Sequence, residues 1–381
     1  MAARRSIKVA MIIIAIAIAA LAVVGWVFKD QIVSQFFKPT ESSVQQGTVG
    51  SSTELVTVAA SKLETPWSIT FTPSGDMLVT ERSGQLQRIG DNGKTYTIDG
   101  VEETSEGGLL GVALHPNFES NNFIYIYKTT STGSGLQNQI ERYTLQNDQL
   151  SARQVILATI PAASNHNGGG IAFGPDNKLY VTTGDAANGE LAQDTTSLAG
   201  KILRLNDDGS SPSDNPFGNA VWSYGHRNPQ GIAWDSQDRP WSVEHGPSGD
   251  QKGRGKDELN LIEKGANYGW PVIAGDEKRE GMRAPVAQSG ENDTWAPGAL
   301  AYSDGSLYFA GLRGESLYEA KIKPDAGVEL VRHFTSEYGR LRAVTAYDSK
   351  LYVSTSNRDG RGSPKADDDR ILVVDPKKLT P

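Results

Sequence analysis

A single histidine stands in a setting that suits proton transfer. His166 lies in the stretch "SNHNGGGIAFGPDNKLYVTTGD" (residues 164–185), between two asparagines and before a glycine run and a strand-like segment. Imidazole exchanges a proton readily near neutral pH, so His166 is a candidate general base. Taken alone, the residue is better explained as a solvated loop histidine, and the rest of the sequence has to decide.

Four arginines stand at comparable places near other strand-like segments. Arg227 lies in "SYGHRNPQG", Arg313 in "AGLRGES", and Arg340 and Arg342 in "YGRLRAV", where the i, i+2 spacing points both side chains to one side of a strand. Arginine recognises carboxylates through two parallel hydrogen bonds. Any one of them is as well explained by an ion pair with one of the 45 acidic residues. As a set beside His166, they predict a small polyanionic ligand.

One hairpin phrase recurs six times along the chain. Each copy is a short apolar triplet, a turn containing Pro, Asp, Asn or Gly, and a β-rich run, as in "WSITFTPSGDMLVTE". The spacing of the copies, roughly 43 to 68 residues, leaves room for four strands in each repeat. The copies begin at Trp67, Leu109, Gly169, Gln230, Gly298 and Arg342.

Six repeats of this length predict an all-β fold, a six-bladed β-propeller with four-stranded antiparallel blades. A β-sandwich is the alternative, but it does not account for one phrase repeated along the whole domain. In a propeller the first strand of each blade lines the central axis, and the loops at one end of these strands form a funnel. We therefore expect His166 and the arginines to meet in that funnel.

The N-terminal region is predicted to be separate from the propeller. Residues 9–28 form an uncharged apolar run, long enough at ~1.5 Å per residue to cross the ~30 Å core of a bilayer. Basic residues within 1–8 keep that end in the cytoplasm and export the remainder. We expect a cytoplasmic N-terminus (1–8), a transmembrane signal anchor (9–28), a flexible tether (29–53) that adds nothing to the funnel, and the propeller (54–381). A cleaved signal peptide is the alternative, and it also exports the propeller.

Composition excludes several classes of function. The formal net charge of −8 is unsuited to non-specific nucleic-acid binding, which depends on a basic surface. The absence of cysteine excludes disulfides, thiolate catalysis and zinc–thiolate sites. Without disulfides, an exported propeller has to be stabilised by packing, and bound ions are an additional source of stability.

Several segments are specific enough to indicate a family. "NHNGGGIAFGPD", "YGHRNPQGIAWD", "EHGP", "DELNLIEKGANYGWP" and "GRLRAV" resemble the soluble aldose sugar dehydrogenases that depend on pyrroloquinoline quinone (PQQ), in the glucose/sorbosone dehydrogenase family. The likeness runs from about residue 55 to residue 374. It implies an enzyme that oxidises the anomeric carbon of an aldose to a lactone and passes the electrons to an external acceptor.

The resemblance also implies roles for the candidate residues. His166 matches the general base, which takes the proton of the anomeric hydroxyl as hydride leaves for the cofactor. Arg227 and Asn228 match residues beside the quinone oxygens. Glu106, in "EGGLLG", stands near the cofactor where glutamine is common in the family. The residues that match holders of the PQQ carboxylates are Arg340, Arg342 and Arg313, the last in place of the usual lysine.

Calcium belongs to the same resemblance. The backbone carbonyls of Gly246 and Pro247 match the family's ligands for an ion that polarises the quinone. A separate structural calcium is implied at Glu258, with the carbonyl of Tyr268, although a surface salt bridge explains Glu258 nearly as well. The expected cofactors are therefore PQQ and Ca²⁺.

Two other functions stay open. A calcium-dependent propeller lactonase would hydrolyse rather than oxidise, and would need carboxylates and asparagines around one axial metal instead of converging arginines. A non-catalytic sugar-binding propeller should have lost His166 or Arg227, and both are present. The expected partners are an aldose, an external electron acceptor and, through residues 9–28, the cell membrane.

Overall fold

The computed structural model describes residues 37–50, 55–91, 93–250 and 252–381. The predicted cytoplasmic N-terminus (1–8), the predicted transmembrane segment (9–28) and the first part of the predicted tether (29–36) lie outside the described residues. Within the described ranges, no helix is long and apolar enough to cross a membrane. The structure therefore describes the predicted propeller and residues 37–50 of the predicted tether.

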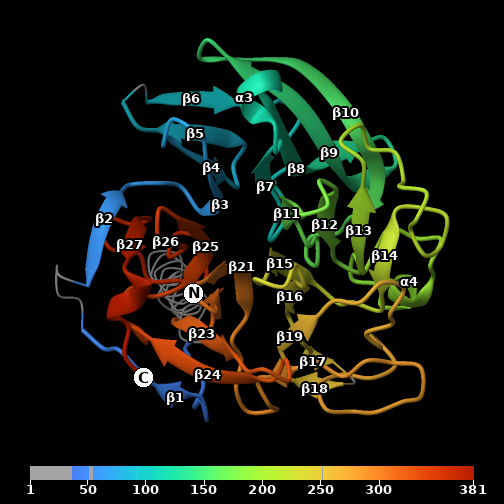
Figure 1. Ribbon diagram of the computed structural model, residues 1–381, viewed down its shortest axis with the longest axis vertical. Coiled ribbons are helices and arrows are strands. Elements are labelled where there is room, and N and C mark those ends of the chain that lie inside the picture. The colour runs from blue at the N-terminus through green and yellow to red at the C-terminus, as the bar shows by residue number, and fades with distance from the viewer. Residues whose placement is uncertain (1–36, 51–54, 92, 251) are drawn as a thin grey trace, which may run out of the picture.

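Six β-sheets stand around a central axis as the blades of a propeller (Figure 1). Their innermost strands are β3 (Pro66–Phe71), β7 (Leu109–Leu114), β11 (Ile171–Phe173), β15 (Pro229–Trp234), β21 (Pro297–Ser303) and β25 (Leu341–Tyr347). Each innermost strand contacts the next one around the axis, and β25 contacts β3, so the ring is closed. The predicted all-β, six-bladed propeller is confirmed.

Each blade continues outward through three further antiparallel strands. In the first three blades these are β4 (Met77–Glu81), β5 (Gln85–Ile89) and β6 (Lys94–Thr97); β8 (Phe123–Thr132), β9 (Gly135–Gln146) and β10 (Gln149–Pro161); and β12 (Leu179–Thr183), β13 (Lys201–Leu205) and β14 (Val221–Tyr224). In the last three they are β16 (Pro240–Glu244), β19 (Glu258–Leu261) and β20 (Ala287–Gln288); β22 (Ser306–Gly311), β23 (Leu317–Ile322) and β24 (Val328–His333); and β26 (Lys350–Thr355), β27 (Ile371–Val374) and β2 (Val56–Ala60).

Strand β2 closes the ring. It comes from the start of the propeller but pairs antiparallel with β27, so the last blade is built from both ends of the domain. The remaining elements of the described propeller are short and lie in loops. They are the hairpin of β17 (Ser248–Asp250) and β18 (Gly253–Arg254), the helices α3 (Phe118–Asn121) and α4 (Glu190–Gln193), and the 3-10 helix η1 (Pro376–Lys378).

The predicted hairpins are the two inner strands of each blade. Strands β11 and β12, for example, pair antiparallel on either side of the turn "GPDNK". In this turn the amide of Gly174 donates to the carbonyl of Lys178 over 2.9 Å, and Asn177 has a left-handed backbone with a φ of 58°. Asparagine tolerates this conformation better than most residues, which explains the turn chemistry of the repeated phrase.

The inner strands approach one another closely because glycine stands where they meet. A Cβ on Gly231 of β15 would lie 2.5 Å from the amide nitrogen of Leu300 on β21. A Cβ on Gly298 of β21 would lie 2.1 Å from the carbonyl oxygen of Arg342 on β25. Any side chain at these positions would push neighbouring blades apart. The repeated glycine thus sets the width of the axis on which the candidate site is built.

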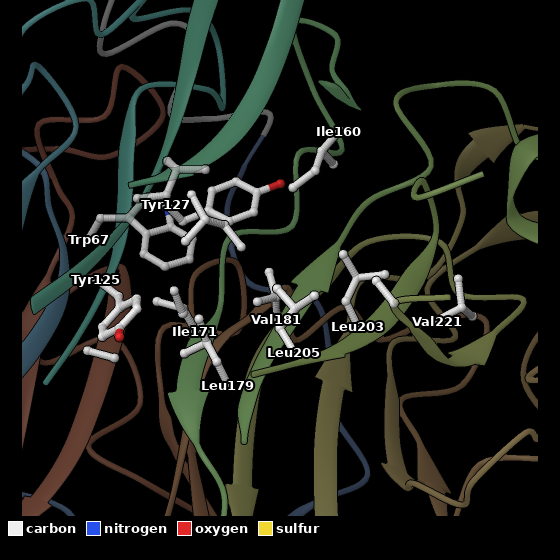
Figure 2. Packing of buried hydrophobic residues seen from close by; sticks show 14 residues of the cluster. Trp67, Tyr125, Tyr127, Ile160, Ile171, Leu179, Val181, Leu203, Leu205 and Val221 are labelled. Atoms are coloured by element: carbon white, nitrogen blue, oxygen red, sulfur yellow. The ribbon is translucent and has the colours of Figure 1, made fainter. Parts of the chain in front are cut away.

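The apolar faces of neighbouring blades pack against each other. One such core joins Trp67 of β3, Tyr125 of β8 and Val181 of β12 with further buried side chains of the first three blades (Figure 2). Aromatic and β-branched side chains suit these layers because they fill a pleated, fully covered surface. The core fixes the strands, and the loops at their ends are left to carry polar groups.

Part of the predicted tether packs against the propeller. Within residues 37–50, β1 (Gln45–Gln46) adds a parallel fifth strand to the outer edge of β24. Thr48 is buried, and its amide donates to His333 Nδ1 over 3.1 Å. The segment has few apolar residues, and backbone pairing, hydroxyl groups and the packing of Val44 against the core hold it in place. The sequence predicts a flexible tether (29–53) that adds nothing to the funnel, whereas residues 37–50 pack against the propeller.

Candidate active site

A cavity of about 1020 Å³ opens at the end of the axis where the inner strands begin. Its walls come largely from the loops that precede β7, β11 and β15 and from those that follow β12 and β16. Three of the predicted site residues, Glu106, His166 and Arg227, line it. A second cavity of about 670 Å³ lies further along the same inner strands, and the residues described as its walls include no acidic, basic or histidine side chain. The candidate chemistry therefore belongs to the first cavity.

His166 is held in a strained loop conformation in the cavity wall. Its backbone has a φ of 59°, in the left-handed region that residues other than glycine rarely adopt. Its amide donates to Glu106 Oε2 over 3.0 Å, and its carbonyl accepts from the amide of Ala186 over 3.2 Å. Gly184 makes room for this loop, because a Cβ there would lie 2.0 Å from the His166 carbonyl oxygen. The glycine near His166 thus allows the loop to hold the histidine in this conformation.

Asp185 fixes the orientation of the imidazole. Its Oδ1 lies 2.7 Å from His166 Nδ1, and its Oδ2 accepts the indole N–H of Trp270 over 2.7 Å. Asp185 is buried, whereas the His166 side chain keeps 13% of its surface exposed. A carboxylate at Nδ1 keeps the proton on that nitrogen and leaves Nε2 as the basic one. The pair has the arrangement of an oriented general base.

Glu106 is an ionised carboxylate in the cavity wall. Arg361 donates to Glu106 Oε1 over 3.3 Å and to Ser105 Oγ over 3.0 Å. Burial alone would raise the pKa of Glu106, but the positive charge of Arg361 and the amide of His166 hold it below its usual value. Burial lowers the pKa of His245 to about 3, so this imidazole is neutral at neutral pH. Glu106 can therefore accept hydrogen bonds from the hydroxyls of a ligand.

Arg227 and Asn228 lie together beside the cavity. The Arg227 guanidinium stands 5.2 Å from the centroid of the Trp270 ring, and its backbone amide donates to Glu244 Oε2 over 2.7 Å. Asn228 is fully buried, and its Oδ1 accepts from the amide of Gly168 over 3.0 Å. Its Nδ2 has no hydrogen-bond partner among the described residues. A buried donor without an acceptor costs about 1–3 kcal/mol, so this amide favours a ligand that carries acceptors.

The two arginines of "GRLRAV" differ in their partners. Arg340 donates through Nε and Nη2 to Asp359 Oδ2 over 3.0 and 2.8 Å, so its charge is matched within the protein. Arg342 donates to Gln230 Oε1 over 2.5 Å, and its Nε has no hydrogen-bond partner in the described part of the chain. Burial lowers the pKa of Arg342 to about 9, which leaves it charged at neutral pH. The Arg342 guanidinium stands 5.5 Å from the centroid of the Trp67 ring, and neither Arg340 nor Arg342 is among the described residues that line the cavity.

Arg313 lies apart from the other predicted site residues. It is not among the residues that line the cavity, and its Nε stands 3.4 Å from the carbonyl oxygen of Lys38. The sequence predicts that Arg313 meets the other arginines in the funnel, and the family resemblance implies that it holds a carboxylate of PQQ. The position of Arg313 gives that role no support.

Gly246 and Pro247 form a buried turn at the edge of the cavity. Their neighbours His245 and Ser248 both line it. The amide of Gly246 donates to Asp257 Oδ1 over 2.8 Å, and a Cβ on Gly246 would lie 2.1 Å from a backbone carbonyl oxygen. The backbone of the two predicted carbonyl ligands is thus tightly packed beside the cavity.

Glu258 and Tyr268 lie outside the cavity, in a separate buried cluster. Glu258 Oε1 accepts the amide of Gly275 over 3.0 Å, and one side-chain amide, that of Asn260, donates to both Glu258 and Glu244 over 3.1 and 3.0 Å. Burial and the charge of Glu244 raise the pKa of Glu258 to about 8. Two buried carboxylates that share one donor favour either a proton or a bound cation between them. The alternative of a surface salt bridge does not hold, because Glu258 is buried.

No three His, Asp or Glu side chains gather as a metal site within the residues that the structure describes. A calcium ion at either predicted place would therefore take most of its ligands from backbone carbonyls or water. Such ligands are ordinary for calcium, which binds oxygen of any kind.

Sequence reasoning missed several residues of the cavity wall. Asp185, His245 and Trp270 stand inside the motifs "TTGD", "EHGP" and "NYGWP", so a signal for them was present. Arg361 and Phe37 lie in segments that carry no recognisable motif, and both reach the cavity only through the fold.

Comparison with known proteins agrees with this architecture. The family model described as Glucose / Sorbosone dehydrogenase matches residues 63–366. The aldose sugar dehydrogenase YliI of Escherichia coli is 31% identical over 343 residues, covering 80% of this chain and 91% of that protein. Quinoprotein glucose dehydrogenase B of Acinetobacter calcoaceticus is 38% identical over 256 residues, covering 57% of this chain and 52% of that protein. The solved structure of the PQQ-bound aldose sugar dehydrogenase from Streptomyces coelicolor is 39% identical, with a TM-score of 0.78, and the match covers 88% of this chain and 98% of that one.

Proposed function

The chain belongs to the glucose/sorbosone dehydrogenase family, and on this basis we propose that it is a PQQ-dependent aldose sugar dehydrogenase that oxidises the anomeric carbon of an aldose to a lactone. Relatives named as quinoprotein and aldose sugar dehydrogenases, which are oxidoreductases, support this assignment. The observation that carries it is the hydrogen-bonded His166–Asp185 pair in the cavity wall, beside Asn228, whose buried Nδ2 has no hydrogen-bond partner among the described residues.

The donors around the cavity fit PQQ, which carries three carboxylates and an ortho-quinone. Arg227 and Asn228 would hold the quinone oxygens and Arg342 a carboxylate, since Asn228 Nδ2 and Arg342 Nε lack acceptors among the described residues. Arg340 is already paired with Asp359, and its remaining Nη1 and Nη2 hydrogens would be its contribution to a PQQ carboxylate. When bound, PQQ supplies the redox chemistry by accepting the two electrons of the sugar C–H bond as a hydride.

His166 would accept the proton of the anomeric hydroxyl at Nε2. The hydroxyl proton passes to the imidazole while the anomeric hydrogen leaves with its electron pair, and the carbon becomes the carbonyl of a lactone. Asp185, at Nδ1, stabilises the imidazolium that forms and keeps Nε2 directed at the substrate. The imidazolium then returns its proton to water, and an external acceptor removes the two electrons.

Calcium is the second proposed cofactor. Gly246 and Pro247 would present carbonyl oxygens to an ion beside the cavity, where its charge assists reduction of the quinone. Glu258 and the carbonyl of Tyr268 would hold a second ion that stabilises the fold. The support is the packed turn at Gly246 and the pair of buried carboxylates formed by Glu244 and Glu258.

An optical experiment tests the proposed function. PQQ and Ca²⁺ are added to the purified cofactor-free protein, glucose follows, and the absorbance of the quinone is recorded. We expect conversion to the quinol spectrum, with the lactone as product. A protein that hydrolyses lactones and leaves the PQQ spectrum unchanged would be a lactonase instead. One that binds sugar without turnover would be a non-catalytic propeller.

Arg342→Ala is expected to weaken PQQ binding. The change leaves a carboxylate of the cofactor without its partner, and a charge-assisted hydrogen bond contributes ~1.5–3 kcal/mol. The dissociation constant for PQQ should therefore rise roughly ten- to more than a hundred-fold, measured by absorbance titration. With saturating PQQ, turnover should partly recover and the KM for glucose should move little.

Two further variants, Arg340→Ala and Arg283→Ala, distinguish the loss of a PQQ contact from a general loss of protein stability. Arg340 is paired with the buried Asp359, so its loss should lower the thermal stability as well as the PQQ affinity. Arg283 is an exposed arginine paired with Glu263, and its replacement should change neither. A sharp rise in the KM for glucose with unchanged PQQ affinity in Arg342→Ala would assign that arginine to the substrate.

We also propose that the propeller works outside the cytoplasm, tethered to the membrane through residues 9–28. The support is the uncharged apolar run and the basic residues before it. Mass spectrometry of the N-terminus distinguishes an intact anchor in the membrane fraction from a cleaved signal peptide, whose product would begin near Ala22.

A further inference from the structure

Residues 37–50 run from the cavity to the outer edge of the blade formed by β21–β24, and we call them the N-terminal strap. Phe37 lines the cavity at one end of the strap, and β1 pairs with β24 near the other. Figure 1 shows β1 beside β24 at the rim of the propeller. The strap is therefore a fixed part of this blade that brings a side chain to the candidate active site.

The middle of the strap is tied to a buried carboxylate. Thr40 Oγ1 donates to Asp293 Oδ1 over 3.2 Å, and the hydroxyl of Ser42 donates to Asp293 Oδ2. The amide of Thr294 donates back to Thr40 Oγ1 over 3.0 Å. Because Asp293 is only 5% exposed, loss of both hydroxyl donors would leave its charge poorly compensated.

The far end of the strap is packed so closely that only glycine fits. A Cβ on Gly47 would lie 2.6 Å from Val331 Cγ1 and 2.7 Å from the carbonyl oxygen of Thr380. The amide of Gly47 donates to the carbonyl of Arg332 over 2.9 Å, which continues the pairing of β1 with β24. Backbone pairing and close contact together fix the register of the strap, and so the position of Phe37.

Phe37 is connected to the loop of the candidate base. The guanidinium of Arg361 stands 5.5 Å from the centroid of the Phe37 ring, within the range of a cation–π contact. The same guanidinium donates to Glu106 Oε1, and Glu106 Oε2 accepts the amide of His166. Phe37 therefore lies on the Glu106 side of the cavity, beside groups suited to binding the hydroxyls of a sugar.

The described residues of the cavity wall include two Phe, Tyr or Trp side chains, those of Phe37 and Trp270. The other wall residues are charged, polar or small. A pyranose ring combines a rim of hydroxyls with faces of C–H groups, and aromatic rings pack against such apolar faces. Trp270 is already engaged by Asp185 and Arg227. Phe37 contacts Arg361 through its ring, but it takes no part in the proposed proton and hydride transfer, which leaves its aromatic surface for the sugar.

We propose that the N-terminal strap completes the sugar-binding part of the cavity, and that Phe37 is a specificity-determining residue that packs against the apolar face of the aldose ring. The inference rests on the proposed function. Because Phe37 contacts the sugar rather than the cofactor, its effect falls on the KM for the sugar, and kcat and PQQ affinity stay nearly constant.

Phe37→Ala in the full-length chain is expected to raise the KM for glucose about ten-fold, near the lower end of what an apolar pocket contact contributes. The dissociation constant for PQQ, measured by absorbance titration, should stay at the wild-type value. Phe37→Tyr keeps the ring and should keep the KM. Val49→Ala is the matched control, because Val49 lies on the same strap but is 64% exposed and outside the cavity wall.

A second variant tests the strap rather than the ring. The double change Thr40→Ala and Ser42→Ala removes both hydroxyls that bind Asp293 and should also raise the KM for glucose, again without loss of PQQ affinity.

An unchanged KM in Phe37→Ala would overturn the role of Phe37. A fall in PQQ affinity that accounts for the whole effect would assign the ring to the cofactor. A wild-type protein that oxidises no aldose with PQQ and Ca²⁺ would refute the proposed function itself, whereas normal wild-type turnover matched by Phe37→Ala would refute only the role of Phe37.

Discussion

Replacing His166 by glutamine is expected to lower kcat by about 10²–10⁴-fold, the usual cost of removing a general base, while PQQ binds almost normally. Glutamine keeps the approximate size and polarity of the side chain but cannot accept the proton of the anomeric hydroxyl. The base acts in the transition state, so the loss should appear in kcat and in kcat/KM alike. Steady-state kinetics with glucose and an absorbance titration with PQQ measure the two quantities separately.

Asp185→Asn distinguishes an oriented base from a histidine that merely lies nearby. Asp185 Oδ1 lies 2.7 Å from His166 Nδ1, and an amide there no longer enforces the tautomer with a basic Nε2. We expect a lower kcat together with a changed pH–rate profile, and an unchanged dissociation constant for PQQ. Since Asp185 also accepts the indole N–H of Trp270, the thermal stability has to be recorded as a control. A near wild-type kcat in His166→Gln would remove this histidine from the mechanism.

The fold could be predicted from the sequence because its determinants are local. Each hairpin phrase carries its own turn residues and apolar strands, and six copies of one unit admit few arrangements other than a ring. The same reasoning could not predict that β2 closes the ring. It depends on pairing between the two ends of the domain, Val56 with Val374, which no local pattern encodes.

The N-terminal strap was mistaken for a flexible tether for a physical reason. Its composition is polar, and polar composition normally indicates a segment with nothing to bury. The strap is instead held by hydroxyls on Asp293, by backbone pairing with β24 and by the close packing of Gly47. None of these contacts requires an apolar residue. A sequence reading based on hydrophobic pattern cannot detect them.

The candidate site was predictable where a motif carries it and not elsewhere. His166, Glu106 and Arg227 meet in the cavity because each precedes an innermost strand of a different blade. Arg313 follows an inner hairpin instead, and its side chain reaches the carbonyl of Lys38 on the strap rather than the cavity. Arg361 reaches Glu106 from a loop of the last blade, a contact set by the closed ring. Arg340 also precedes an innermost strand, but it is paired with Asp359 and is not among the described residues that line the cavity, so position in the blade alone does not decide which side chains reach it.

Removing calcium before PQQ is added is expected to prevent formation of the holoenzyme. The carbonyls of Gly246 and Pro247 would hold the proposed ion beside the cavity, where its charge would favour PQQ binding, so PQQ should bind weakly and glucose oxidation should be lost in the presence of a chelator. Restoring Ca²⁺ in excess should restore both. The absorbance of bound PQQ and the rate of glucose oxidation are the measurements, with and without the chelator.

The second proposed ion predicts a separate effect on stability. Glu258 and Glu244 are buried and share the amide of Asn260, and a cation between them would offset their repulsion. Calcium at 100-fold excess over its dissociation constant would raise the free energy of unfolding by about 2.7 kcal/mol, which thermal unfolding can detect. Glu258→Gln should abolish this calcium-dependent rise while calcium-dependent PQQ binding persists, because Glu258 lies outside the cavity. Full activity and tight PQQ binding in metal-free protein would show that Gly246 and Pro247 are not ligands, and a calcium-dependent rise retained in Glu258→Gln would show that the second ion binds elsewhere.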